Sequence, residues 1–212
     1  MPAQATSIEA LAKLLIAKAA SHRVIAGIAG APGSGKSTAA EALSDAINVH
    51  APGTAAVLPM DGYHFDDILL NQLGRRARKG APDTFDVGGF RHMLLRLREN
   101  AEAEVLVPVF DRDIEIARAG ARVIPQSVKV IIAEGNYLLL KTDPWATLRP
   151  LFDATVFIDV PEQTLRERLT ARWIHYKLSP EGIRAKLEDN DLPNGRFVIA
   201  ESVEPDWRIV QA

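Results

Sequence analysis

Short apolar runs of strand length alternate along this chain with segments whose apolar residues recur at helical spacing. The strand-like runs lie at 24–29, 55–60, 128–133, 155–160 and 207–210. The helix-like segments lie at 7–20, 36–48, 87–100, 161–173 and 180–190. Several strand runs are apolar at every position, which is typical of strands buried on both faces of a parallel sheet. The alternation therefore predicts a three-layer α/β fold, with a mostly parallel central sheet and helices on both of its faces.

Two long segments, 63–86 and 103–127, interrupt this alternation with polar, highly charged sequence. They lack a clear helical or strand pattern and are too long to be simple connections. Loops of this length in a compact domain are usually functional. We therefore expect both segments to be irregular loops that serve the active site.

The amino-terminal region, 1–20, has the pattern of a structural helix rather than of a signal peptide. Lys13 and Lys18 interrupt its apolar residues, and Thr6 and Glu9 have the spacing of a capping box. No apolar run anywhere in the chain reaches the length needed to cross a bilayer. The sequence predicts a cytoplasmic protein without a membrane partner.

Composition adds limits on chemistry and partners. A chain of 212 residues predicts one domain, 1–212. The net charge of −2 provides no general attraction for nucleic acid, so no nucleic-acid partner is expected. The chain has no cysteine, which excludes disulfides and thiolate chemistry. No heptad seam identifies an oligomeric state, and a homodimer stays open.

The segment GAPGSGKST, residues 30–38, fits the Walker A pattern of Gly, four residues and Gly-Lys-Ser/Thr. It follows a strand-like run and opens a helix-like one, as a phosphate-binding loop requires. Its backbone N–H groups would hold phosphate oxygens, Lys36 would reach the outer phosphates, and the Ser37 hydroxyl suits a magnesium ion. The residues predicted to bind the nucleotide are Gly30, Gly33, Ser34, Gly35, Lys36, Ser37 and Thr38. The alternative is a glycine-rich turn that binds nothing, which the flanking patterns disfavour.

A carboxylate, Asp61, follows the second strand-like run in the sequence PMDGYHF. In a kinase that phosphorylates an alcohol, one carboxylate orients the hydroxyl and accepts its proton, and Asp61 is placed for that role. Tyr63, His64 and Phe65 come next and are predicted to line the pocket of the phosphoryl acceptor. The alternative readings are a simple Asp-Gly turn for Asp61 and a structural histidine for His64.

A second carboxylate, Glu134, ends the buried run VIIA of a strand predicted to be parallel to the first. It is predicted to hold the magnesium ion or its shell, since a buried acid without a partner is costly. Asn136 would reach the same cleft as a substrate contact, or would simply cap the turn. A buried acid satisfied by structural hydrogen bonds is the alternative for Glu134.

Basic residues supply further candidates. Arg168 and Arg172 are four residues apart on a predicted helix, so they share a face and could balance the charge of phosphoryl transfer. The alternative is a solvated helix on which they pair with nearby glutamates. Arg112 and Arg118, in the second long segment, are predicted to contact the substrate. The basic run RRARKG, 75–80, is more typical of a solvated loop, and a role near an anionic phosphoryl acceptor is the alternative.

Together these motifs resemble the group of phosphate-loop kinases that contains uridine kinase, pantothenate kinase and phosphoribulokinase. The resemblance runs from about residue 22 to the end and is carried by GAPGSGKST, PMDGYH, RKGAPDTFD, VPVFDR, AEGNYLLL and RERLTAR. NDLPNGR, 190–196, resembles a subgroup named for kinases of fructose transport systems. The resemblance implies a P-loop NTPase fold with a short lid at about 161–192. It also implies ATP and Mg²⁺ as cofactors. The lid after Trp173 is shorter than the family's, and its arginine pattern is only partly kept.

The leading hypothesis is thus an ATP- and Mg²⁺-dependent kinase that phosphorylates a hydroxyl of a small molecule such as a sugar, a nucleoside or a pantothenate-like compound. A nucleotide switch that binds partners is one alternative, because DVGG, 86–89, has the letters of a GTPase switch. The residues before it are not strand-like, which makes the match accidental. A regulatory module that binds ATP without chemistry is the other alternative. The set of Lys36, Asp61 and Glu134 argues against it.

Overall fold

Strand β2 (Val24–Gly30) is buried at every residue and lies inside a six-stranded sheet. The structure is a computed structural model, which describes residues 3–211. The other strands of this sheet are β1 (Gln4–Ala5), β3 (Ala55–Pro59), β6 (Val130–Glu134), β7 (Ala154–Asp159) and β8 (Trp207–Val210). Their order is β1-β8-β7-β2-β6-β3, and every neighbouring pair is parallel. The predicted parallel α/β sheet is confirmed.

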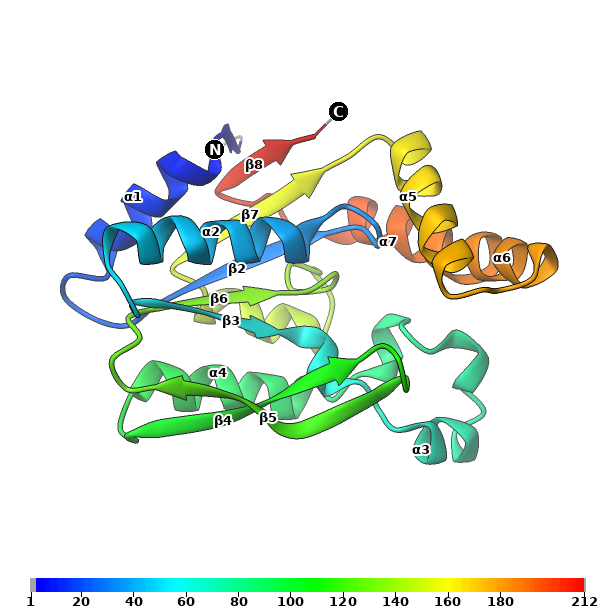
Figure 1. Ribbon diagram of the computed structural model, residues 1–212, viewed down its shortest axis with the longest axis horizontal. Coiled ribbons are helices and arrows are strands. Elements are labelled where there is room, and N and C mark those ends of the chain that lie inside the picture. Colours follow the sequence, from blue (N-terminus) through cyan, green and yellow to red (C-terminus); the bar gives the residue numbers. More distant parts are fainter. Residues whose placement is uncertain (1–2, 212) are drawn as a thin grey trace.

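Helices cover both faces of the sheet (Figure 1). One face packs on α1 (Ile8–Lys18) and α2 (Lys36–His50), and the other on α4 (Val87–Glu99) and α7 (Leu192–Glu201). Along β2, Val24, Ala26 and Ile28 pack on the first face, whereas Ile25 and Ala29 pack on the second. Alternate residues of one strand thus enter two separate cores, which explains why the strand is apolar throughout.

The remaining helices lie around one end of the sheet. They are α3 (Asp67–Gln72), α5 (Glu162–His175) and α6 (Pro180–Lys186). Short 3₁₀ turns lie at Met60–Tyr63, Arg76–Arg78, Pro82–Thr84 and Trp145–Leu151, and a π-turn at Leu187–Asp191 joins α6 to α7. None of the helices within residues 3–211 is both long and apolar enough to cross a membrane.

The prediction of an irregular loop at 103–127 is wrong. This segment forms an antiparallel hairpin of β4 (Glu104–Asp111) and β5 (Ile116–Pro125). Val105, Val107 and Ile124 point into the core beneath α4, while most of the residues between them are exposed. The alternation was present in the sequence, but charged residues on the outer face concealed it.

The ends of the chain also differ from expectation. Residues 1 and 2 of the predicted helical region 1–20 lie outside the described residues, and Gln4–Ala5 form a short strand beside β8. Ser7, rather than Thr6, caps α1, because its hydroxyl accepts a hydrogen bond from the Ala10 N–H at 3.2 Å. The helix predicted at 180–190 continues through the π-turn into α7, where no helix was expected.

Arg23 fixes the end of the sheet where β2 begins. Its side chain is buried and donates to four backbone carbonyls, those of Val128 (2.8 Å), Leu97 (2.9 Å), Pro125 (2.9 Å) and Gln126 (3.2 Å). These carbonyls belong to the end of α4 and to the connection that leaves the hairpin for β6. One guanidinium therefore joins the sheet, the helix and the hairpin.

Replacing Arg23 with alanine should lower the free energy of unfolding by about 2–4 kcal/mol, because several charge-assisted hydrogen bonds are lost and buried carbonyls lose their donor. Urea unfolding followed by circular dichroism would measure the change. Arg91→Ala, at an exposed position of α4, is the matched control and should change stability by less than about 0.5 kcal/mol. Equal stability of the two variants would contradict this role of Arg23.

Candidate active site

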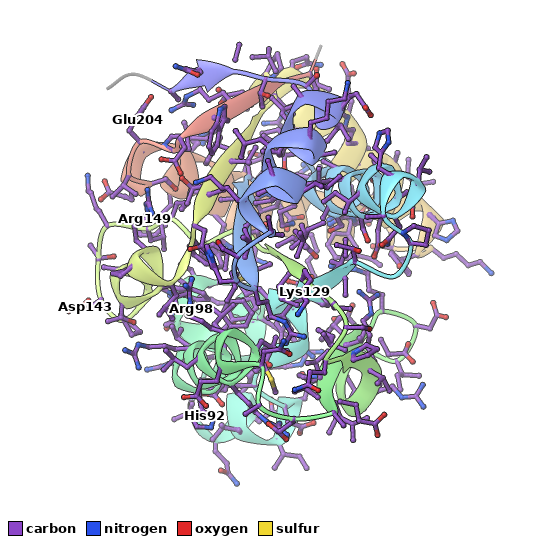
Figure 2. All side chains as sticks on the ribbon, turned by 90° about the vertical axis from the view of Figure 1, so that its left-hand side faces the viewer. His92, Arg98, Lys129, Asp143, Arg149 and Glu204 are labelled. Atoms are coloured by element: carbon purple, nitrogen blue, oxygen red, sulfur yellow. The ribbon has the colours of Figure 1, made fainter. Side chains whose placement is uncertain are left out.

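A cleft opens at the carboxyl ends of the parallel strands. In Figure 1 the arrowheads of these strands point toward the side that carries α3, α5 and α6. The cleft is lined by the loop after β2, the turn after β3, the segment 79–85, the tip of the hairpin, and residues between 172 and 194, most of which belong to the region 161–192 predicted as the lid. Figure 2 looks onto the opposite end of the molecule, where Arg98 and Arg149 lie. The site is therefore at the sheet edge where ligands of such folds bind.

The loop between β2 and α2 has the backbone of a phosphate cradle. Gly33 and Gly35 adopt left-handed conformations, with φ of 81° and 80°, which bring the chain sharply into α2. A Cβ atom at Gly33 would lie 2.9 Å from Leu169 Cγ of α5. The Ser34 N–H donates to the Ala31 carbonyl at 3.0 Å, and the loop is buried as far as Ser34. A side chain at Gly33 would disturb the loop where its N–H groups must approach phosphate.

Lys36 and Glu134 meet beneath this loop. Their Nζ and Oε2 atoms are 4.0 Å apart, and both side chains are buried. Glu134 Oε2 has no hydrogen-bond partner among the described residues. Burial raises the pKa of Glu134, and the negative charge of Asp61 adds to the rise, while Lys36 and the Ser37 hydroxyl oppose it. An unsatisfied buried carboxylate oxygen is costly, so this position is suited to a ligand that supplies positive charge.

Ser37 and Thr38 open α2 with exposed side chains, beside the buried Lys36. The Ser37 hydroxyl and the Glu134 carboxylate are oxygen ligands of the kind that magnesium prefers. Residues 3–211 contain no group of three or more acidic or histidine side chains that could hold an ion alone. A magnesium ion that arrives with a nucleotide needs only one or two protein ligands besides the phosphates, so Ser37 and Glu134 fit it.

Asp61 lies in the same cleft, in the 3₁₀ turn after β3, and forms an ion pair with Arg112 of the hairpin. Burial of the carboxyl group acts to raise its pKa. The positive charges around it, led by Arg112 and including Lys36 and Arg172, outweigh burial and hold the pKa of Asp61 below its usual range. Asp61 is therefore ionised at neutral pH, as a group that accepts a hydroxyl proton must be.

His64 is held rigidly next to Asp61. Its ring lies between Phe85 and Phe110, with centroid distances of 4.1 Å and 4.6 Å. Its Nδ1–H donates to the Asp61 carbonyl at 2.7 Å, so Nδ1 carries the proton. Burial lowers the pKa of His64, and the ring is neutral at pH 7. The second nitrogen, Nε2, is then a hydrogen-bond acceptor.

The arginines of α5 do not pair with glutamates of their own helix. Arg168 Nη1 donates to the Ser34 carbonyl at 3.3 Å and to Gln211 Oε1 at 3.0 Å, and so contacts the phosphate loop. Arg172 lines the cleft. Burial, together with the nearby Arg112, lowers the pKa of Arg172, although a guanidinium stays charged. Neither Arg168 nor Arg172 has a carboxylate partner in the described part of the chain.

Several residues that the sequence reasoning did not assign to the site join its walls. Lys79 is buried and donates to Asp67 Oδ1 at 2.7 Å and to the Glu115 carbonyl at 2.5 Å. Asn190, which lines the cleft from the π-turn, donates to the Lys79 carbonyl at 3.2 Å. Tyr137 is fully buried and does not line the cleft, but its hydroxyl donates to the Gly80 carbonyl at 2.6 Å. The signal in the sequence that could have indicated Lys79 as a site residue was its place before Gly80 in the basic run 75–80.

Three predicted substrate residues lie away from the cleft. Tyr63 packs in the core against Phe90, with ring centroids 5.0 Å apart. Phe65 donates its backbone N–H to the Thr84 carbonyl and is not among the residues that line the cleft. Arg118 pairs with Asp111 on a separate hollow of the hairpin. The turn after β3 directs the Tyr63 side chain into the core and the His64 side chain toward the cleft. The other predicted substrate residues, His64, Arg112 and Asn136, do line the cleft.

Two sequence signals have structural explanations. Arg75 and Arg78 of the run 75–80 pair with Asp83, as expected of a solvated loop. Asp86 of DVGG caps α4 by accepting a hydrogen bond from the Gly89 N–H at 2.8 Å. DVGG is therefore the start of a helix, and the match to a GTPase switch is accidental, as expected.

Comparisons with known proteins agree with this geometry. A sequence model of the Phosphoribulokinase / Uridine kinase family matches residues 24–170. A Schizosaccharomyces pombe protein named "Putative uridine kinase C227.14" is 32% identical over 192 residues, which are 87% of this chain and 82% of that protein. An "ATP-dependent kinase-like protein" of Aspergillus versicolor is 32% identical over 70% of this chain and 95% of its own length.

Among solved structures, a "putative fructose transport system kinase" from Silicibacter sp. TM1040 superposes with a TM-score of 0.87. It is 36% identical, and the match covers 96% of this chain and 98% of that one. The chain belongs to the Phosphoribulokinase / Uridine kinase family and has the fold of the P-loop kinases. The family resemblance seen in the sequence is confirmed.

Replacing Gly33 with alanine should lower the affinity for ATP by roughly tenfold or more, because the new methyl group displaces the loop and a lost amide contact costs about 1.5 kcal/mol. Titration calorimetry with ATP would measure the loss. Gly53→Ala is the matched control, since Gly53 has a φ of 71° but nothing within 4 Å of the new Cβ. If both variants bind ATP like the parent protein, the loop is not the phosphate site.

Proposed function

We propose that this member of the Phosphoribulokinase / Uridine kinase family transfers the terminal phosphoryl group of ATP to a hydroxyl of a small molecule. One observation carries the proposal: the lysine of the phosphate loop, Lys36, and the ionised Asp61 line the same cleft. A protein that only bound nucleotide would have no need for an ionised carboxylate at that position. The family supports ATP as the phosphoryl donor.

The phosphate loop would hold the nucleotide. The N–H groups from Gly33 to Lys36 face a site where the start of α2 adds its positive dipole end. Lys36 Nζ would shift from Glu134, 4.0 Å away, toward the outer phosphates. These groups bind the polyphosphate in a fixed orientation, so that the terminal phosphorus faces the part of the cleft that contains Asp61.

Asp61 would direct the substrate. Its carboxylate accepts a hydrogen bond from the reacting hydroxyl and takes up the proton while the oxygen bonds to the terminal phosphorus. The bond from that phosphorus to the bridging oxygen breaks, and ADP leaves with the electron pair. Arg112 keeps Asp61 ionised and lines the same cleft as Lys36, so it could share the negative charge of the transferring group.

The arginines of α5 would complete the charge balance. Arg168 already contacts the phosphate loop at the Ser34 carbonyl, and Arg172 lines the cleft one helical turn away. Because neither is paired with a carboxylate within residues 3–211, both are free to bind phosphate oxygens as the charge spreads during transfer. Residues of the lid would exclude water, which otherwise competes with the substrate hydroxyl.

Magnesium would be held by the Ser37 hydroxyl and by Glu134, whose Oε2 is buried without a hydrogen-bond partner among the described residues. When bound, the ion neutralises charge on the phosphates. The net positive charge that it brings would also relieve the burial cost that raises the pKa of Glu134. Glu134 would then be ionised in the loaded enzyme.

Asp61→Asn should keep ATP affinity within about threefold and lower phosphoryl transfer by roughly 10²–10⁴, the usual contribution of a general base. A screen of ATP consumption over sugars, nucleosides and vitamin precursors identifies the substrate, after which the variant is measured on it. Asp113→Asn, on the exposed tip of the hairpin, makes the same change of charge and should leave turnover intact. Full activity of Asp61→Asn would exclude its proposed role.

Arg112→Gln should move the acidic limb of the profile of kcat/KM against pH to higher pH. Arg112 holds the pKa of Asp61 down, so without it the pKa rises. Activity requires the deprotonated carboxylate and is lost as the pH falls through that pKa, so the loss begins at a higher pH in the variant. Arg118→Gln on the same hairpin is the control. Coincident limbs for Arg112→Gln and the parent protein would contradict the coupling.

A further inference from the structure

The carboxyl end of β8 reaches the phosphate loop. β8 runs parallel to β7, with Val210 opposite Asp159, so both strands end at the side of the sheet that carries α5 (Figure 1). The N–H of Gln211, the next residue, donates to the Asp159 carbonyl at 2.9 Å. This bond fixes the backbone of Gln211, and its side chain meets Arg168 of α5. A residue far from the Walker A segment in the sequence thus borders the candidate nucleotide site.

Gln211 and Arg168 lie together beside Gly35 of the phosphate loop. A Cβ atom added at Gly35 would be 3.4 Å from Gln211 Oε1 and 3.6 Å from Arg168 Nη1. Gly35 is the residue before Lys36, and its left-handed φ of 80° directs the chain into α2. The pair therefore contacts the part of the loop whose N–H groups would hold phosphate.

Two acceptors hold one nitrogen of the Arg168 guanidinium. Nη1 donates to the Ser34 carbonyl at 3.3 Å and to Gln211 Oε1 at 3.0 Å. A guanidinium is planar and rigid, so fixing Nη1 on two sides also fixes the direction of the other N–H groups. Within residues 3–211, Nε and Nη2 of Arg168 have no hydrogen-bond partner. Their N–H groups are left for a ligand, and they suit phosphate oxygens.

The acceptors that hold Arg168 are neutral. A backbone carbonyl and an amide oxygen leave the positive charge of the guanidinium available to a polyanion. Arg166 on the same helix is different, because it forms an ion pair with Glu188 of the π-turn. A carboxylate partner would offset the charge of Arg168 in the same way and weaken its attraction for phosphate. The amide of Gln211 is thus suited to hold an arginine without neutralising it.

We infer that Gln211 is a positioning residue of the nucleotide site, which orients Arg168 toward the phosphates of ATP. The inference rests on the nucleotide binding in the function proposed above. Gln211 Oε1 and the Ser34 carbonyl hold the guanidinium from the last strand and from the loop itself. An arginine that is already held in the free protein loses less side-chain entropy when the nucleotide binds, so its contribution to affinity is larger.

A double-mutant cycle tests whether Gln211 acts through Arg168. Titration calorimetry measures the dissociation constant of MgATP for the full chain and its variants. Gln211→Ala should raise this constant about fivefold, and Arg168→Ala about tenfold or more. The double variant should bind like Arg168→Ala alone, because Gln211 then has no arginine to hold. Losses that multiply in the double variant would overturn the inference, and so would parent-like affinity in Gln211→Ala.

A change of Gln211 to glutamate separates positioning from support of the fold. Gln211→Glu keeps the size of the side chain and an oxygen for Arg168, but it adds a negative charge. Affinity for MgATP should fall at least as far as in Gln211→Ala, while the melting temperature stays the same or rises. Parent-like affinity in Gln211→Glu would contradict the need for a neutral acceptor. Gln72→Ala, at an exposed position of α3, is the matched control and should bind MgATP like the parent protein.

The same measurements distinguish this inference from the proposed kinase activity. If MgATP binds with the expected cycle but no substrate is phosphorylated, the inference stands and the kinase activity is contradicted. If a substrate is phosphorylated but the losses multiply, the kinase activity stands and the inference is overturned. If MgATP does not bind to the parent protein, both are contradicted.

Discussion

The site depends on the burial of a cation, Lys36, beside a carboxylate, Glu134, at the edge of a parallel sheet. Charges removed from water are costly unless they are close to opposite charges. The register of the sheet provides this closeness, because Glu134 lies opposite Ile28 of β2 and Pro59 of β3. The chain therefore leaves β2 for the phosphate loop, and β3 for Asp61, on either side of one acid. The groups proposed to bind nucleotide and substrate converge because three parallel strands end together.

The contacts that hold the walls of the cleft together differ in kind from those that hold the sheet to its helices. On the two faces of the sheet, large apolar side chains pack in two cores, whereas the hairpin tip and residues 187–194 reach the cleft mainly through polar contacts. Lys79 holds the hairpin tip at the Glu115 carbonyl and receives Asn190 of the lid, and the apolar cluster of the lid is small. Segments with few buried apolar contacts open at low free-energy cost. The base of the cleft is thus held by apolar packing, whereas its walls are held mainly by polar contacts.

Local patterns in the sequence predict the base of the site well. Fully apolar strands and the Gly-Lys-Ser pattern place the loop, Asp61 and Glu134 correctly, because each depends on residues adjacent in the chain. The walls depend on contacts between distant segments. The sequence did not reveal that Tyr63 turns into the core while His64 faces the cleft, since a 3₁₀ turn sets their directions. The hairpin was also not evident from the sequence, because its inward-facing residues are identified only by their packing beneath α4.

The charged groups of the cleft gather around Asp61, where cations from three separate segments surround one acid. Arg112 and Lys79 are tied to carboxylate or carbonyl oxygens. Arg172 has no carboxylate partner within residues 3–211, yet it lies close enough to Asp61 to help lower its pKa. The cations around Asp61 outweigh the burial of its carboxyl group, so charge rather than exposure to water keeps it ionised.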